Sequence, residues 1–191
     1  MGLKLITPPA AEPVTLQEAK EHLRITGSDE DALLTTFIEV AREYCEEYQN
    51  KAYITQTWDL SLDEFPESPY SLPKPPLQSI SSIKYYDQDG TEQEFNATDY
   101  LVDTASVKGR ISLAYGKTWP SVTLQPINGV VIQFVAGYGD ATTDVPERIR
   151  NAIKVLIGQI YENREATDIK EHLEVPFAVH ALLGLDRIML T

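Results

Sequence analysis

Cys45, the single cysteine of the chain, is the residue best suited to nucleophilic chemistry. A thiol becomes a catalytic nucleophile when a base such as histidine lies beside it, and the chain offers His22, His172 and His180. Cys45, however, falls in a run of apolar residues that recur every three or four positions, as on one face of a helix. Because a buried free cysteine behaves as a small hydrophobic residue, we interpret Cys45 as part of the core.

Asp87-Gln88-Asp89-Gly90 resembles part of a calcium-binding loop, in which alternate carboxylates hold the ion and a glycine makes the sharp turn. The same register would put Tyr85 at the first ligand position and Asn96 at the twelfth, and neither is a carboxylate. Asp-Gly between two apolar segments instead indicates a tight hairpin, because glycine readily adopts a positive φ. We therefore predict a hairpin here and no metal site.

The remaining sequence carries no motif of catalysis. Gly137-Tyr138-Gly139 lacks the third glycine of a dinucleotide-binding loop, and no Walker loop, zinc-ligand spacing or serine-hydrolase elbow occurs. The 29 acidic residues would place some pair at glycosidase distance in any fold, so a carboxylate-based hydrolase gains no support from their number. The sequence predicts a protein that is not an enzyme and has no cofactor.

Aromatic side chains gather in the central third of the sequence: Trp58, Tyr70, Tyr85, Tyr86, Tyr115 and Trp119. Exposed rings stack on sugars or on a protein partner, which makes a carbohydrate- or receptor-binding module one interpretation. Aromatic residues on strands also fill cores and pair across strands, which is the more ordinary interpretation.

The composition is that of a globular protein of 191 residues, with 42% hydrophobic and 24% charged residues. The formal charge is −13, and no cluster of lysine and arginine exists to neutralise phosphates. This balance argues against sequence-specific nucleic-acid binding and against an anionic membrane as partner. We expect a soluble protein made in the cytoplasm, because no stretch resembles a signal peptide or a membrane span.

Residues 15–50 predict two helices. Thr15 and Glu18 have the spacing of a capping box, and Gly27 ends the first helix. Ser28 to Asp31 opens the second helix, where early acids complement the helix dipole. Its apolar stripe consists of Leu33, Leu34, Phe37, Ile38, Ala41, Tyr44, Cys45 and Tyr48.

Residues 52–140 change to a strand pattern, with strands expected at residues 57–62, 80–86, 91–95, 100–102, 110–114 and 130–136. Val130 to Val135 is the most hydrophobic of these and is expected in the centre of the sheet. Five prolines between Pro66 and Pro76 predict an irregular or edge-running loop, and residues 1–14 predict an extended lead-in.

Helical periodicity returns at residues 145–190. Asp144 and Glu147 predict a second capping box, and an apolar stripe follows at Ile149, Ala152, Ile153, Leu156, Ile157, Ile160 and Tyr161. We expect the two striped helices to pack on each other. The predicted fold class is α+β: one domain over residues 1–191, in which N- and C-terminal helices form a bundle and an antiparallel β insertion lies between them.

The last segment is very apolar and follows a polar link at residues 163–174. It either folds back on its own domain or contacts a partner, since an exposed apolar face marks a protein–protein contact. The residues of the partner-binding hypothesis are Phe177, Val179, Leu182, Leu183, Leu185, Ile188 and Leu190.

The order of these segments resembles the phage head–tail connector proteins. The resemblance is carried by residues 13–24, Asp29-Glu30-Asp31, residues 38–44 and 52–58, Pro75-Pro76-Leu77-Gln78-Ser79-Ile80, Gly137-Tyr138-Gly139, Val145-Pro146-Glu147 and residues 182–187. It spans nearly the whole chain, and the order and spacing are more specific than any single piece.

The resemblance implies a structural role in the virion of a tailed phage, at the neck between head and tail. Many copies would form a ring under the portal protein, extend the DNA channel and present a docking surface for the next neck, head-closure or tail protein. DNA would pass through the lumen without sequence-specific binding. An acidic lumen would repel the DNA backbone and so agrees with the charge of the chain.

Overall fold

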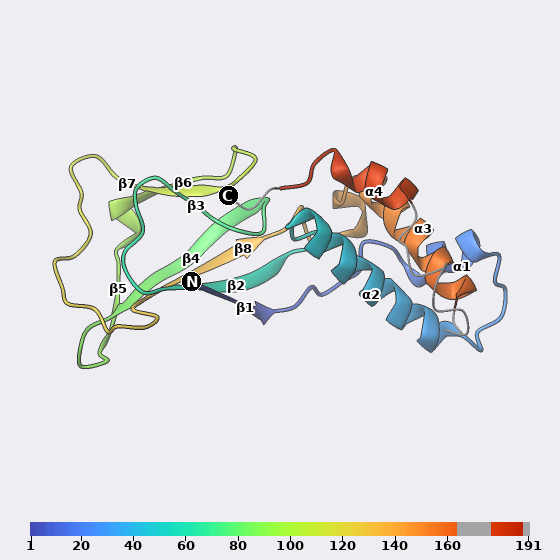
Figure 1. The fold of residues 1–191 in the computed structure, drawn as a ribbon, viewed down its shortest axis with the longest axis horizontal. Helices are drawn as coiled ribbons and strands as arrows, with labels where there is room; N and C mark the ends of the chain where they lie inside the picture. The colour runs from blue at the N-terminus through green and yellow to red at the C-terminus, as the bar shows by residue number, and fades with distance from the viewer. Residues whose placement is uncertain (164–176, 189–191) are drawn as a thin grey trace. The chain divides into compact units, whose positions relative to one another are not determined.

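The structure is a computed structural model that describes residues 1–163 and 177–188. The chain divides into two compact units. The β unit comprises Met1–Pro9 and Thr55–Tyr138, and the helical unit comprises Ala10–Ile54 and Gly139–Thr191 (Figure 1). The expected α+β class with antiparallel sheets is confirmed. In the described part of the chain no helix is both long enough and apolar enough to cross a membrane.

The β unit is built on a five-stranded antiparallel sheet in the order β1-β2-β8-β4-β5. Its strands are β1 (Gly2–Thr7), β2 (Gln56–Leu62), β4 (Leu77–Tyr86), β5 (Glu92–Glu94) and β8 (Val130–Ala136). β8 lies between β2 and β4, as its hydrophobic sequence predicts (Figure 1). Every second residue of β8 is buried, because successive side chains of a strand point to opposite faces of the sheet.

β1 was not expected as part of a sheet. Residues 1–14 predict an extended lead-in, and Gly2–Thr7 is indeed extended, but it also pairs antiparallel with β2 over Gly2↔Ser61 to Thr7↔Thr57. The pairing is not predictable from local sequence because it joins residues more than fifty positions apart.

A second, three-stranded sheet has the order β3-β7-β6. It consists of β3 (Tyr70–Ser71), β6 (Tyr100–Asp103) and β7 (Arg110–Leu113). β3 lies within the proline-rich segment, for which an irregular or edge-running loop is predicted, and it is an edge strand of this sheet.

The hairpin predicted at Asp89-Gly90 is confirmed between β4 and β5. The Asp87 carboxylate accepts hydrogen bonds from the N–H groups of Asp89 and Thr91, both at 3.0 Å, and Gly90 has a φ of +78°. Asp87 therefore caps the turn, which explains why a carboxylate stands at that position.

The helical unit contains α1 (Leu16–Leu23), α2 (Asp31–Gln49), α3 (Glu147–Glu162) and α4 (Phe177–Gly184). The predicted packing of the two striped helices is confirmed, because α2 and α3 bury their stripes against each other. Cys45 lies within this contact and is fully buried, and burial raises the pKa of its thiol to about 12. It is a core residue, as the sequence predicts.

One of the two predicted capping boxes is present. The Thr15 hydroxyl accepts a hydrogen bond from the Glu18 N–H at 3.2 Å, and the Glu18 carboxylate accepts one from the Thr15 N–H at 2.9 Å. The box predicted from Asp144 and Glu147 is wrong, because α3 begins at Glu147 directly after Pro146. The Asp144 carboxylate instead accepts the N–H of Ala141 at 2.9 Å, within a short 3₁₀ turn.

Replacing Thr15 with alanine should lower the free energy of unfolding by about 1 kcal/mol, because α1 loses the side chain that caps it. The measurement is urea unfolding of the full chain. Thr36→Ala is the control: Thr36 is exposed within α2, where alanine is the better helix former, so this variant should lose no stability. Equal losses in the two variants would contradict the capping argument.

Candidate assembly surfaces

The C-terminal segment divides into a buried side and an exposed side. On α4, Val179 and Leu183 are fully buried in the helical unit, and Leu182 is half-buried. Phe177 and Leu185 are 87% and 74% exposed. Of the other two residues in the hypothesis, Ile188 is half-buried and Leu190 lies outside the described residues.

Hydrogen bonds tie α4 and the residues after it to the end of α2. The buried Gln49 amide donates to the carbonyl of Leu183 at 2.6 Å and accepts from the Tyr53 hydroxyl at 2.8 Å. Asn50 donates to the carbonyl of Ile188 at 2.8 Å, and the Ile188 N–H donates to the carbonyl of Gln49 at 3.0 Å. Because hydrogen bonds require defined distances and angles, these contacts fix the position of the C-terminal end of α4 in the helical unit.

Aromatic contacts also hold α4 and the residues after it against α2. The Tyr48 ring lies 4.9 Å from the His180 ring, centroid to centroid, and the guanidinium carbon of Arg187 lies 4.6 Å from the Tyr48 centroid. Cation–π contacts of this kind stabilise by roughly 0.5–1 kcal/mol at exposed sites.

Leu185 therefore lies beside anchored backbone at the end of α4, and both its side chain and that of Phe177, at the start of α4, remain exposed. We call this pair the C-terminal apolar face. Two large apolar side chains on an anchored helix and its end are costly in water and are typical of a contact with another protein. The partner-binding hypothesis stays a prediction, and the structure concentrates it on these two residues.

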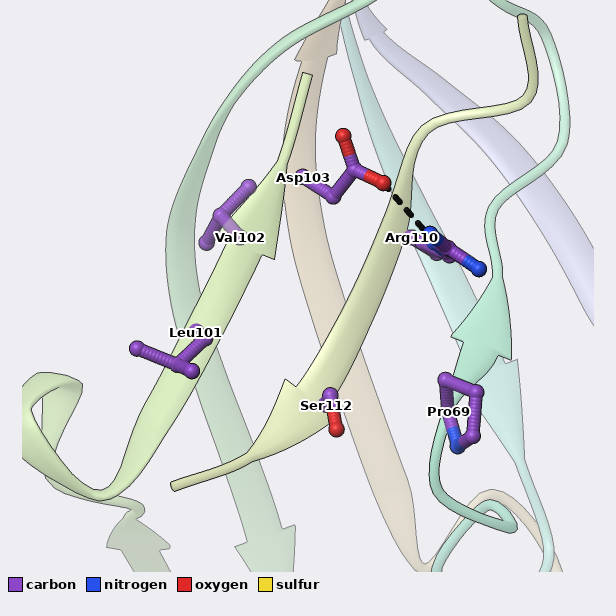
Figure 2. Close-up of a pocket in the computed structure, with 6 residues that line it drawn as sticks. All are labelled: Pro69, Leu101, Val102, Asp103, Arg110 and Ser112. Carbon is purple, nitrogen blue, oxygen red and sulfur yellow. Dashed lines mark hydrogen bonds and ion pairs between the residues drawn. The ribbon is translucent and has the colours of Figure 1, made fainter. Parts of the chain in front are cut away.

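A second apolar surface lies on the three-stranded sheet, where a shallow pocket of about 600 Å³ opens between β6 and the start of β3. It is lined by Pro69, Leu101, Val102, Asp103, Arg110 and Ser112. Figure 2 shows Leu101 and Val102 on β6, with Pro69 on the other side of β7. Leu101 is 63% exposed, on an edge strand that already offers unpaired backbone groups.

The floor of this pocket is held by an ion pair across two strands. Arg110 Nε lies 2.8 Å from Asp103 Oδ2, and the same carboxylate accepts hydrogen bonds from Ser106 and Ala105 (Figure 2). The hydrogen bonds from Ser106 and Arg110 hold the pKa of Asp103 well below its usual range. Asp103 is accordingly ionised at neutral pH and acts as a turn cap rather than as an acid catalyst.

Sequence reasoning did not find this pocket. The only sequence signal for this pocket is Leu101-Val102, two consecutive apolar residues in a strand of four. In a strand with one buried face an apolar residue normally alternates with a polar one, so two in succession put an apolar side chain on the exposed face. Neither residue is distinguished by sequence from the core residues of the other strands.

Several aromatic residues of the β unit pack against one another. Trp119 stacks on Phe65 at 5.2 Å and contacts Phe95 at 4.8 Å, and its indole N–H donates to the carbonyl of Pro66 at 2.8 Å. Trp58 is half-buried, with Lys74 Nζ 5.6 Å from its ring centroid. These contacts account for Trp119 as a packing residue, and the carbohydrate-binding interpretation gains no support from it.

Most positive charges in the described part of the chain are already paired with carboxylates. The bases that form ion pairs are Lys20, Arg42, Lys84, Arg110, Lys117, Arg148, Arg150 and Lys154. The helical unit has 19 acidic and 10 basic residues, so the excess of negative charge is greatest there. α2 exposes Glu39, Glu43 and Glu47, which are spaced four residues apart and share one side of the helix.

Residues 13–114 match the family described as phage gp6-like head–tail connector protein. No curated protein matches the chain. Among solved structures, a chain in the virion of a native gene transfer agent particle is similar, with 25% identity and a TM-score of 0.82. Chains in the neck of the empty particle, computed with C6 symmetry, and of the native particle, computed with C12 symmetry, show 27% and 26% identity with TM-scores of 0.82 and 0.79. Each match covers 100% of this chain and 97% of the other.

Proposed function

Because this chain belongs to the phage gp6-like head–tail connector family, whose members are structural proteins of the virion neck, we propose that it joins the head of a phage-like particle to its tail. Many copies form a ring beneath the portal protein and extend the channel through which DNA passes. The observation that carries the proposal is the likeness to neck proteins over the whole chain, in both units. The role is structural and involves no catalytic step.

Rotational symmetry supports the ring. The similar chains lie in necks that were computed with C6 and C12 symmetry. A cyclic assembly of this kind requires each copy to present two different surfaces, one for each neighbour. Self-association is thus part of the proposal, together with contacts to the portal above and to a head-closure or tail protein below.

We assign the C-terminal apolar face to one of the contacts with a different neck protein. Phe177 and Leu185 are exposed, and the backbone on either side of Leu185 is anchored by Gln49 and Asn50. Burying two such side chains in a partner's groove removes apolar surface from water, which is the main driving force of association.

The charge distribution supports the passage of DNA without binding. The chain carries a net charge of −13, and the exposed acids of α2 add a continuous negative stripe. Specific and non-specific DNA binders both need free lysine and arginine to displace counterions from phosphates. A surface with few unpaired bases repels the DNA backbone and lets it slide.

Deletion of the gene in a phage that encodes this chain tests the proposal. Electron microscopy of the lysate should show heads, filled or leaking, beside separate and complete tails, because the joint between them is missing. Supplying the gene in trans should restore joined particles and serves as the control. Complete virions that merely fail to adsorb would contradict the proposal and favour a role in receptor binding.

A further inference from the structure

The five-stranded sheet of the β unit ends in two unlike edges. β1 lies at one end and β5 at the other, and within the described residues no strand pairs with the outer side of either. The outer side of each edge strand therefore presents backbone N–H and C=O groups that can pair with a strand of another chain.

β1 lacks most of the devices that normally protect an edge strand. It has six residues and contains no proline, and Leu5 and Ile6 are both 40% exposed. A register shift between Leu5 and Thr7 interrupts only its last part, and Lys4 is its one charged residue. β5 is the opposite: it has three residues, two of which are glutamates. An apolar edge with a single base thus stands at one end of the sheet, and a short acidic edge stands at the other.

The charges on the two edges are complementary and lie on the same face of the sheet. On β1, Lys4 lies opposite Asp59 of β2. Two residues further along β2, Ser61 lies opposite Val131 of β8. Val131 in turn lies opposite Lys84 of β4, which lies opposite Glu94 of β5. Since residues two apart on a strand share a face, Lys4 and Glu94 point to the same side. Lys4 lies opposite Asp59 and Glu94 lies opposite Lys84 on the neighbouring strands, but within residues 1–163 and 177–188 neither forms an ion pair at 4.0 Å or less, whereas Glu92 is 2.7 Å from Lys84.

We propose that neighbouring copies in the ring join by continuing this sheet, so that β5 of one copy lies beside β1 of the next and Glu94 pairs with Lys4. The inference rests on the proposed ring and names its subunit contact. Such a contact is heterologous, with a different surface on each side, and heterologous contacts are those that close into rings.

The strand directions give the contact a defined geometry. Four antiparallel steps separate β1 from β5, so the two strands run in the same direction within one copy. In the proposed contact the strands run along the ring axis, so the rotation between neighbours about a sixfold or twelvefold axis keeps that direction. The new pair of strands is therefore parallel, although every pair within the sheet is antiparallel.

Zero-length carbodiimide cross-linking of assembled necks tests the proximity directly. Within one copy β1 and β5 are four strand spacings apart, about 19 Å, which an amide bond between Lys4 and Glu94 cannot span. Necks assembled from isotopically light and heavy copies should therefore yield mixed-isotope peptides that join Lys4 to Glu94. The absence of such peptides from well-assembled, efficiently cross-linked necks would overturn the inference.

A charge exchange tests the energetics. Lys4→Glu and Glu94→Lys should each weaken incorporation into joined particles by roughly tenfold, because like charges then face each other across the contact. The double variant restores opposite charges and should recover most of the loss. Glu67→Lys makes the same charge change at an exposed position outside the strands and should assemble normally.

The outcomes separate this inference from the proposed function. Normal incorporation of both single variants, together with joined particles that contain the protein, would refute the strand contact and leave the neck role intact. Complete virions from the gene deletion would refute the neck role itself. Reduced incorporation of each single variant, together with restored incorporation of the double variant, would establish the contact. A general effect of surface charge on assembly would not be reversed by the second substitution.

Discussion

Replacing Arg42 with alanine should lower the free energy of unfolding by about 3–5 kcal/mol, because the change leaves the buried Glu46 and the half-buried Glu12 without their cation. Arg42 Nε lies 2.9 Å from Glu12 and its Nη1 lies 2.8 Å from Glu46. Glu46 also accepts the N–H of Tyr53 at 2.7 Å, so the cluster joins the segment before α1, the middle of α2 and the chain after it. Urea unfolding of the full chain at neutral pH measures the loss.

Glu43→Ala is the matched control for this cluster. Glu43 also approaches Arg42, at 3.5 Å, but its side chain is 70% exposed, whereas that of Glu46 is 8% exposed. Exposed ion pairs contribute at most about 1 kcal/mol, so Glu43→Ala should be nearly neutral. Similar losses from Arg42→Ala and Glu43→Ala would show that burial does not determine the strength of the cluster.

The pH dependence of the Arg42→Ala variant provides a second measurement. Burial already raises the pKa of Glu12 above its usual value of 4.5, even with Arg42 beside it. A carboxyl whose pKa is higher in the folded than in the unfolded protein binds its proton more tightly when folded, so its contribution to stability grows as pH falls. Without Arg42 this effect becomes larger. The difference in stability between variant and parent should therefore shrink as pH is lowered from 7 toward 4.5.

Substituting both Phe177 and Leu185 with aspartate should reduce the yield of joined particles by about a hundredfold, since two apolar anchors of an interface are replaced by charges. Both side chains are exposed in the free protein, so the free energy of unfolding should change by less than about 1 kcal/mol. Particle counts by electron microscopy and urea unfolding of the purified variant provide the two readouts.

Tyr115→Asp is the control for this assembly defect. Tyr115 is also a fully exposed large side chain, but it lies in the β unit, outside α4. It should assemble at the level of the parent protein. A double variant at Phe177 and Leu185 that assembles equally well would remove the C-terminal apolar face from the neck contacts.

Elements with strong local signals were predictable from sequence. The stripes of α2 and α3, the Thr15–Glu18 capping box and the Asp89-Gly90 hairpin all depend on residues within a few positions of one another. β1 could not be found in this way, because its strand character comes from pairing with β2 and not from its own six residues. The predicted capping box of α3 is wrong because Pro146 precedes the first residue of that helix, Glu147, and the Asp144 carboxylate belongs to the turn before it.

The candidate site was predictable only as a segment. α4 is apolar on nearly every side, and such a helix has no stripe that tells which residues face the protein. The burial of Val179 and Leu183 follows from the packing of α4 against α2 and α3. Gln49 of α2 and Leu183 of α4 are 134 residues apart in the sequence, so local sequence does not reveal this contact. The exposure of Leu101 likewise follows from the position of β6 at the edge of its sheet.

The division of the chain between the two units has a consequence for biosynthesis. Both units are discontinuous: β1 precedes the helical unit, and β8, in the centre of the sheet, precedes α3 by only ten residues. During translation β1 cannot pair until β2 has emerged from the ribosome, and β2 and β4 cannot join into one sheet until β8, which lies between them, has emerged. Neither unit is thus complete when the first hundred residues have been made. The β unit can be completed once β8 has emerged, whereas the helical unit also needs α3 and α4, which follow β8. No single cut of the chain yields either unit alone.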